Sequence, residues 1–212
     1  MKKLLKNHFG TIMMALGLIL VLSAAGLTAY NFWDEGRAEN AMAEALMGLD
    51  AIMITDLPDN SNPSMVEIPD YMLNPEKDMP ELTLDRNQYV GVLEVPSLGI
   101  RLPIMSEWSY PNLKISPCRY TGSAYLNNMV IAGHNYRSHF GSLSRVRVGD
   151  EVIFTDMDGN NFIYTVAETE TLKPTEIERM VNGDWDLTLF TCTLGGRTRF
   201  TARCVELIDS DM

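Results

Sequence analysis

The chain has 212 residues, enough for one sizeable core with appendages, and its 17 basic and 28 acidic residues give a net charge of −11. Three of the basic residues and no acidic residue lie within positions 1–30, so the remainder carries 14 basic and 28 acidic side chains. Such an acidic body repels phosphate backbones, which argues against nucleic-acid binding. Three cysteines are too few for a disulfide framework, and their odd number leaves at least one thiol free in a single chain.

The N-terminal segment of residues 9–30 is uncharged and mostly apolar. It is long enough to cross a hydrocarbon layer of about 30 Å, and longer than the roughly 7–15 apolar residues of a signal peptide. Lysines precede it and acidic residues follow it, so the positive-inside rule predicts a cytoplasmic N-terminus and an extracellular body. A cleaved signal peptide is the alternative, because small residues near the end of the segment offer cleavage positions.

The next two segments predict a stalk. Residues 34–53 carry apolar side chains at helical spacing, which predicts a helix that forms a stalk or packs on the domain. Residues 58–80 contain five prolines, a density that excludes a long regular element and indicates an extended linker. The predicted division is a tail over 1–8, a membrane anchor over 9–30, a helical and then proline-rich stalk over 31–80, and a folded domain over 81–212.

Strand-like alternation dominates the rest of the chain. A strong hairpin signal lies at residues 156–160, and short helices are predicted near residues 143–146 and 174–180. Many short strands with turn-rich connections indicate a closed or nearly closed barrel. The predicted strands are residues 91–96, 100–104, 130–132, 151–155, 161–167, 187–192 and 199–207.

The stretch of residues 186–204 holds a reactive pair. Apolar and β-branched residues alternate up to Cys192, a Gly-Gly loop follows, and the alternation resumes at Arg199. A hairpin of this kind makes Cys192 and Arg199 neighbours on two antiparallel strands. The thiolate is the nucleophilic form of cysteine, and a fixed positive charge nearby favours it.

A base is needed beside such a thiol, and His134 is the candidate because it follows a short apolar run and therefore ends a strand. His139 lies only five residues away, so spacing alone leaves the choice between the two nearly even. His8 precedes the membrane span and lies on the wrong side of it.

Three spaced motifs in this order resemble the signatures of sortases, the membrane-anchored cysteine transpeptidases of Gram-positive bacteria. They are the Ile-Ala-Gly-His run ending at His134, the Thr-Leu-Phe-Thr-Cys run ending at Cys192, and the downstream Arg199. The resemblance covers roughly residues 82–207. It implies a mainly β fold, a closed barrel of about eight strands with short helices, after an N-terminal transmembrane helix and stalk. It also implies a catalytic set of His134, Cys192 and Arg199. No cofactor or metal is expected, since no set of acidic residues aligns with the calcium site of some sortases.

The other cysteines and arginines have plainer interpretations. Cys204 lies on the strand after the loop and is expected in the core, whereas Cys118 matches no chemical pattern. Arg197, beside two glycines, is expected to be solvated in the loop. Arg203 shares a strand face with Arg199 but lies further from the loop.

The resemblance implies a transpeptidation. Cys192 attacks the threonine carbonyl of a Leu-Pro-x-Thr-Gly-like sorting signal, and the resulting thioester passes the protein to an amine, such as that of a lipid-linked peptidoglycan precursor. His134 moves the protons and Arg199 stabilises the oxyanion. The alternatives are a membrane-anchored cysteine protease that uses water as acceptor, a pilus-polymerising sortase, and a non-enzymatic module with inert thiols. No Asp-Pro-aromatic motif occurs in the stalk, so an active-site lid is not expected.

Overall fold

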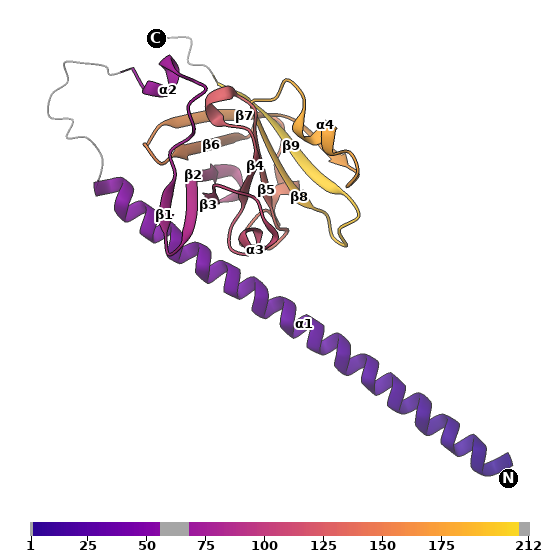
Figure 1. The fold of residues 1–212 in the computed structure, drawn as a ribbon. Coiled ribbons are helices and arrows are strands. Elements are labelled where there is room, and N and C mark those ends of the chain that lie inside the picture. The colour runs from indigo at the N-terminus through magenta and orange to yellow at the C-terminus, as the bar shows by residue number, and fades with distance from the viewer. Residues whose placement is uncertain (1, 56–67, 208–212) are drawn as a thin grey trace. The chain divides into compact units, whose positions relative to one another are not determined.

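The computed structural model describes residues 2–55 and 68–207, and the chain divides into two compact units between Arg37 and Ala38 (Figure 1). The first unit is the N-terminal part of one long helix, α1 (Lys2–Thr55). Large apolar side chains along it, from Phe9 to Trp33, are exposed. Within the described residues, α1 is the one helix long and apolar enough to cross a membrane.

The second unit is built on a nine-stranded sheet in the order β1-β2-β3-β4-β5-β8-β9-β7-β6. An additional pairing of β2 with β6 closes eight of these strands into a barrel, and β1 forms a hairpin with β2 beside it. The strands are β1 (Leu82–Leu84), β2 (Asn87–Val95), β3 (Ile100–Met105), β4 (Cys118–Thr121), β5 (Met129–Gly133), β6 (Glu151–Asp156), β7 (Asn161–Leu172), β8 (Leu187–Cys192) and β9 (Arg199–Glu206).

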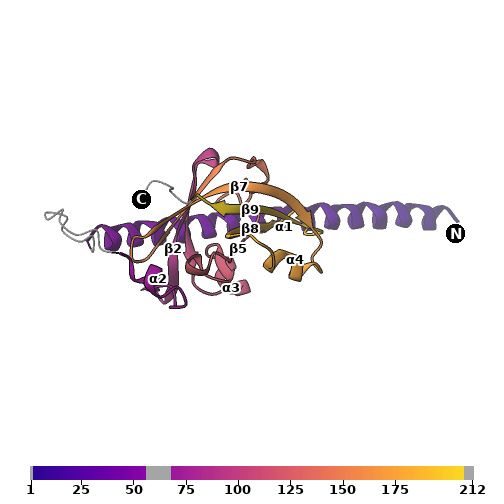
Figure 2. The same ribbon diagram turned by 90° about the horizontal axis from the view of Figure 1, so that it is seen from above.

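The barrel is mixed, because β3 with β4 and β5 with β8 are parallel pairs while the other neighbours are antiparallel. Seen from above, β7, β9 and β8 lie side by side (Figure 2). These findings confirm the predicted closed barrel of about eight strands with short helices. The short helical elements are α2 (Asp70–Leu73), η1 (Pro96–Leu98), α3 (Tyr110–Leu113), η2 (Ala124–Leu126), η3 (Leu143–Arg145) and α4 (Ile177–Val181).

Alternation along the strands separates two apolar clusters. On β8, Leu187 and Leu189 pack in the larger cluster, whereas Phe190 packs against the smaller one. On β5, Ile131 belongs to the larger cluster and Ala132 to the smaller. Because successive side chains of a strand point to opposite faces, the two clusters lie on opposite faces of the barrel wall.

The second half of α1 packs on the smaller cluster. Ala45 and Leu49 are buried there against strand residues such as Val92. Arg101 on β3 reinforces this packing, since its guanidinium makes two hydrogen bonds, of 2.7 and 2.8 Å, to the carboxylate of Asp50 on α1. From Ala38 onward, α1 is therefore part of the second unit.

Most predicted strands are present, and β1 and β4 are additional to them. β4 was missed because it is short, follows a proline, and has a register irregularity between Arg119 and Thr121. The predicted short helices correspond to η3 and α4. The predicted proline-rich linker falls partly on residues 56–67, outside the described residues, and the division into tail, anchor, stalk and domain stays a prediction.

Candidate active site

The β8–β9 hairpin brings Cys192 and Arg199 into register as a pair on antiparallel strands. Paired residues of this kind have Cα atoms about 4.5–5.5 Å apart and side chains on the same face. Both side chains are partly exposed, at the end of the barrel where β8 stops and β9 starts. A thiol and a guanidinium therefore share one accessible patch.

The loop between the two strands is closed by a threonine pair. The amide of Thr193 donates to the carbonyl of Thr198 at 3.0 Å, and the two hydroxyl oxygens lie 2.8 Å apart. Gly195 and Gly196 have φ angles of 82° and 69°, a left-handed conformation that glycine adopts without strain. The Gly-Gly pair is what allows so tight a return from Cys192 to Arg199.

Arg199 is anchored by its own loop. Its Nη1 donates to the carbonyl oxygens of Gly196 and Thr198, each at 3.1 Å. One nitrogen of the guanidinium is thus held by backbone. Because the fork has five N–H donors, others stay available for a ligand.

His134 follows directly after β5, which runs parallel to β8. The last pair of that ladder is Gly133 with Thr191, so the next residues on the two strands are His134 and Cys192. His134 is partly exposed, as Cys192 is. The fold thus brings all three predicted residues, His134, Cys192 and Arg199, to the ends of three adjacent strands.

The two other cysteines are fully buried and differ chemically from Cys192. Burial raises the pKa of Cys118 and of Cys204 to about 12. Both therefore remain protonated near neutral pH, and a protonated thiol is a poor nucleophile. Cys204 lies in the larger apolar cluster, as the sequence predicted.

His139, the rival of His134, is fully buried. Burial, with a smaller contribution from the neighbouring His134, lowers the pKa of His139 to about 4. Its ring is therefore neutral at physiological pH and shielded from any substrate. This burial favours His134 over His139 as the base.

Buried His139 makes the fold sensitive to acid. In the unfolded chain His139 takes up a proton near pH 6.5, whereas in the folded state it does so only near pH 4. The stability of the fold therefore falls as the pH drops through this window. At pH 5 the difference amounts to about 2 kcal/mol. Thermal melts of the wild type and of His139→Gln at pH 7 and pH 5 should show the smaller acid-induced loss in the variant. Equal losses would contradict the assignment.

Arg197 is exposed in the loop, as the sequence predicted. Arg203 is only 2% exposed, and its contacts give it a structural role. Its guanidinium donates to Glu170 at 2.9 Å, to the Met180 carbonyl at 2.8 Å and to the Thr188 hydroxyl at 2.9 Å. Arg203 therefore ties β9 to β7, β8 and α4.

A row of aromatic side chains leads to Cys192. Trp108 contacts Tyr120 with ring centroids 5.6 Å apart, and Tyr120 contacts Phe190 at 5.5 Å. Phe190 lies two residues before Cys192 on β8, on the same strand face. Ser106, Glu107, Arg119 and Thr121 line a shallow pocket together with Trp108 and Tyr120. This surface offers apolar area and polar groups next to Phe190, which shares a strand face with Cys192.

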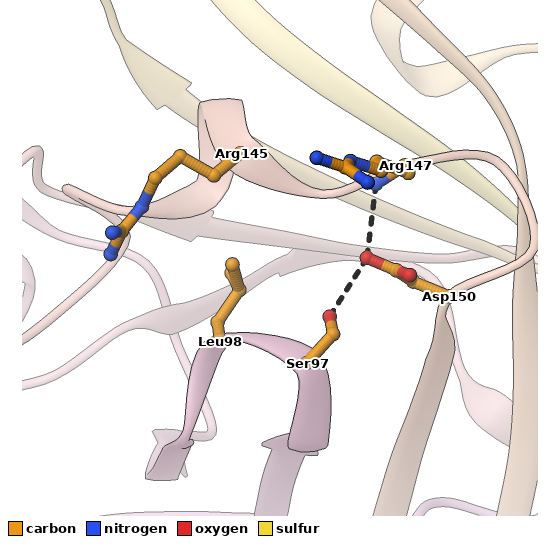
Figure 3. A pocket seen from close by; sticks show the side chains of 5 residues that line it. All are labelled: Ser97, Leu98, Arg145, Arg147 and Asp150. Carbon is orange, nitrogen blue, oxygen red and sulfur yellow. Dashed lines mark hydrogen bonds between the residues drawn. The ribbon is translucent and has the colours of Figure 1, made fainter.

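A second pocket lies where the loop that begins at His134 reaches β6 (Figure 3). The carboxylate of Asp150 accepts from the Ser97 hydroxyl at 2.8 Å and from the Arg147 amide at 3.0 Å. These two donors, the amide first, lower the pKa of Asp150. The strand directions put this pocket at the same end of the barrel as His134. Asp150 therefore links the end of this loop, just before β6, to the β2–β3 turn.

Within residues 2–55 and 68–207, no group of three or more histidine, cysteine or carboxylate side chains is placed to hold a metal ion. The chemistry available at the described site is that of a thiol, an imidazole and a guanidinium. This set suits nucleophilic acyl transfer.

A family profile described as the sortase domain matches residues 93–206, more than half of the chain. The chain belongs to the sortase family. Sortase A of Listeria monocytogenes is 26% identical over 198 residues, covering 89% of this chain and 85% of that protein. Sortase A of Bacillus anthracis is 25% identical over 116 residues, covering 52% of this chain and 55% of that protein.

Solved structures agree on the fold. Sortase C1 of Streptococcus agalactiae matches with a TM-score of 0.58 at 20% identity, covering 79% of this chain and all of that one. A Clostridium perfringens sortase D5 transpeptidase matches with a TM-score of 0.52 at 22% identity, covering 57% of this chain and 79% of that one. Membership of the family makes this chain a sortase-type transpeptidase in general terms and sets it in the cell-wall context of Gram-positive bacteria.

Sequence reasoning missed the aromatic neighbours of the three residues. Phe190 is visible in the sequence only as a strand residue, and its contact with Tyr120 depends on β4. Tyr136 stacks on His134 with ring centroids 4.6 Å apart, and its position two residues after His134 was the available signal.

Proposed function

We propose that this sortase cleaves a Leu-Pro-x-Thr-Gly-like sorting signal through a thioester on Cys192 and transfers the protein to a cell-wall amine. The observation that carries the proposal is the register at the barrel end. Cys192 pairs with Arg199 in the β8–β9 ladder. The last pair of the β5–β8 ladder is Gly133 with Thr191, so His134 and Cys192 are the next residues on these two strands. A nucleophile, a base and a fixed cation thus occupy three adjacent strand ends.

The chemistry follows from the three groups. The Cys192 thiolate attacks the threonine carbonyl carbon, and His134 gives a proton to the amine that leaves when the threonine–glycine bond breaks. The acceptor amine then attacks the thioester, His134 takes its proton, and Cys192 leaves as thiolate. Arg199 donates to the carbonyl oxygen, where negative charge develops in both steps.

The aromatic row is proposed to hold the substrate peptide. Trp108, Tyr120 and Phe190 offer apolar area on the strand face that carries Cys192. An extended peptide bound there would be fixed relative to the thiol, and such positioning lowers the barrier to attack. The partners proposed for the enzyme are secreted proteins with sorting signals and a lipid-linked peptidoglycan precursor as the amine.

We further propose that the N-terminus is cytoplasmic and the barrel extracellular. Lysines lie ahead of the apolar stretch of α1 and acidic residues follow it, in agreement with the positive-inside rule. Protease added to intact protoplasts should digest the barrel. Complete protection of the barrel would reverse the orientation.

The function is tested with the purified full chain, a fluorescent sorting-signal peptide and a range of added amines. A transpeptidase yields the amide product in proportion to the amine, whereas a protease yields only the free acid. The proposal predicts that transfer exceeds hydrolysis at millimolar amine. Hydrolysis that no amine diverts would favour the protease alternative.

A further inference from the structure

We infer that Tyr136 is a positioning residue that fixes the imidazole of His134 by stacking on its face. The inference rests on the proposed function, in which His134 transfers protons. The two rings lie with centroids 4.6 Å apart and planes 28° from parallel, a close stacked arrangement. Tyr136 itself is partly buried.

Backbone hydrogen bonds stabilise the loop that carries both rings. The carbonyl of Tyr136 accepts from the amides of His139, at 3.0 Å, and Gly141, at 2.8 Å, while the carbonyl of His134 accepts from Phe140 at 3.0 Å. The loop thus folds back on itself within eight residues.

Two glycines make this folding back possible. A Cβ atom at Gly141 would lie 2.6 Å from the Tyr136 carbonyl oxygen, and one at Gly133 would lie 2.4 Å from the Phe140 ring. Either contact is closer than packing allows, so the compact loop depends on both glycines.

His139 is a second ring in contact with Tyr136. Its ring centroid lies 5.3 Å from that of Tyr136, and His139 is fully buried. Tyr136 therefore contacts two imidazoles, one partly exposed and one buried. Contact with the buried ring limits how far Tyr136 can move. The loop is fastened again at Asp150, where it reaches β6.

A face-on stack suits the proton transfers assigned to His134. The ring nitrogens lie on the edge of the imidazole, so contact with its face does not cover them. In serine proteases a buried carboxylate orients the histidine, and here the phenol ring supplies an orienting contact.

The test uses the full chain in detergent micelles, with Tyr136→Leu to remove the stack and Tyr136→Phe to retain it. We expect Tyr136→Leu to lower kcat for peptide transfer by roughly 10–100-fold with KM within about twofold, since misplacing a catalytic group affects turnover. Tyr136→Phe should stay within about threefold of wild type.

The matched control is Tyr71→Leu. Tyr71 stacks on Tyr125 at 4.7 Å, and Tyr125 precedes β5, at the end of the barrel opposite to His134. This variant removes an equally close aromatic pair and should leave kcat unchanged. An equal loss of kcat in Tyr71→Leu would mean that general destabilisation, and not positioning, explains the effect.

A second measurement is independent of activity. In the wild type, proton NMR should show nuclear Overhauser effects between the rings of His134 and Tyr136, with the His134 signals assigned through their loss in His134→Ala. Absence of these effects, or an unchanged kcat in folded Tyr136→Leu, overturns the inference. Full activity of His134→Ala would overturn the proposed function instead, while the ring contacts would still be observed.

Discussion

Replacement of Cys192 by alanine is expected to abolish cleavage and transfer of a sorting-signal peptide. Removing the nucleophile of a catalytic set that acts as a unit typically costs on the order of 10⁶ in turnover, which here means background rates. The reason is structural. Cys192 is the cysteine that is partly exposed and stands opposite Arg199, whereas burial raises the pKa of Cys118 and Cys204 to about 12.

The matched controls are Cys118→Ala and Cys204→Ala, which remove thiols buried in the apolar clusters. Each leaves a small cavity and should cost about 1–2 kcal/mol in the free energy of unfolding, with activity of the folded fraction retained. Peptide cleavage and amide formation are followed by chromatography. Activity that survives in Cys192→Ala and disappears in a folded Cys118→Ala or Cys204→Ala would move the nucleophile elsewhere.

Replacement of Arg199 by alanine is expected to lower turnover by about 10²–10³, or roughly 3–4 kcal/mol, the usual effect of removing one donor to an oxyanion. The backbone carbonyls of Gly196 and Thr198 hold one guanidinium nitrogen, so the fork is oriented before substrate arrives. Lysine at this position should rescue little, because a point charge reproduces neither the fork nor its anchoring.

Two neighbouring arginines serve as controls for this prediction. Arg197→Ala should stay close to wild type, since Arg197 is exposed in the loop. Arg203→Ala should destabilise the fold by about 3–5 kcal/mol, because it leaves Glu170 and three further acceptors without this buried donor. Circular dichroism separates folding from turnover. A large loss in folded Arg197→Ala with an active Arg199→Ala would show that the roles are reversed.

The hairpin of the site could be predicted from sequence because its signals are local. Alternation up to Cys192, two glycines and renewed alternation from Arg199 specify two antiparallel strands and their register, and the structure has that register. The closed barrel followed from many short strands in the same way. The parallel pairing of β5 with β8 aligns His134 with Cys192. It joins segments far apart in the chain, so no local sequence pattern predicts it.

The surroundings of the site depend on tertiary packing, which explains what was missed. His134 and His139 lie only five residues apart in the sequence, yet only the second is fully buried. That difference arises because the loop folds back, with Phe140 packed against Gly133. Tyr136 was overlooked for the same reason. Its stacking on His134 becomes visible only once the loop is compact.

The central claim is that Cys192 carries the acyl group, and the most direct measurement is the mass of the trapped intermediate. The full chain is mixed with a sorting-signal peptide without added amine, quenched in acid and digested. The account predicts a thioester of the peptide up to its threonine on the fragment that contains Cys192, and no adduct in Cys192→Ala. An adduct on the fragment of Cys118 or Cys204, or turnover without any thioester in the wild type, would contradict it.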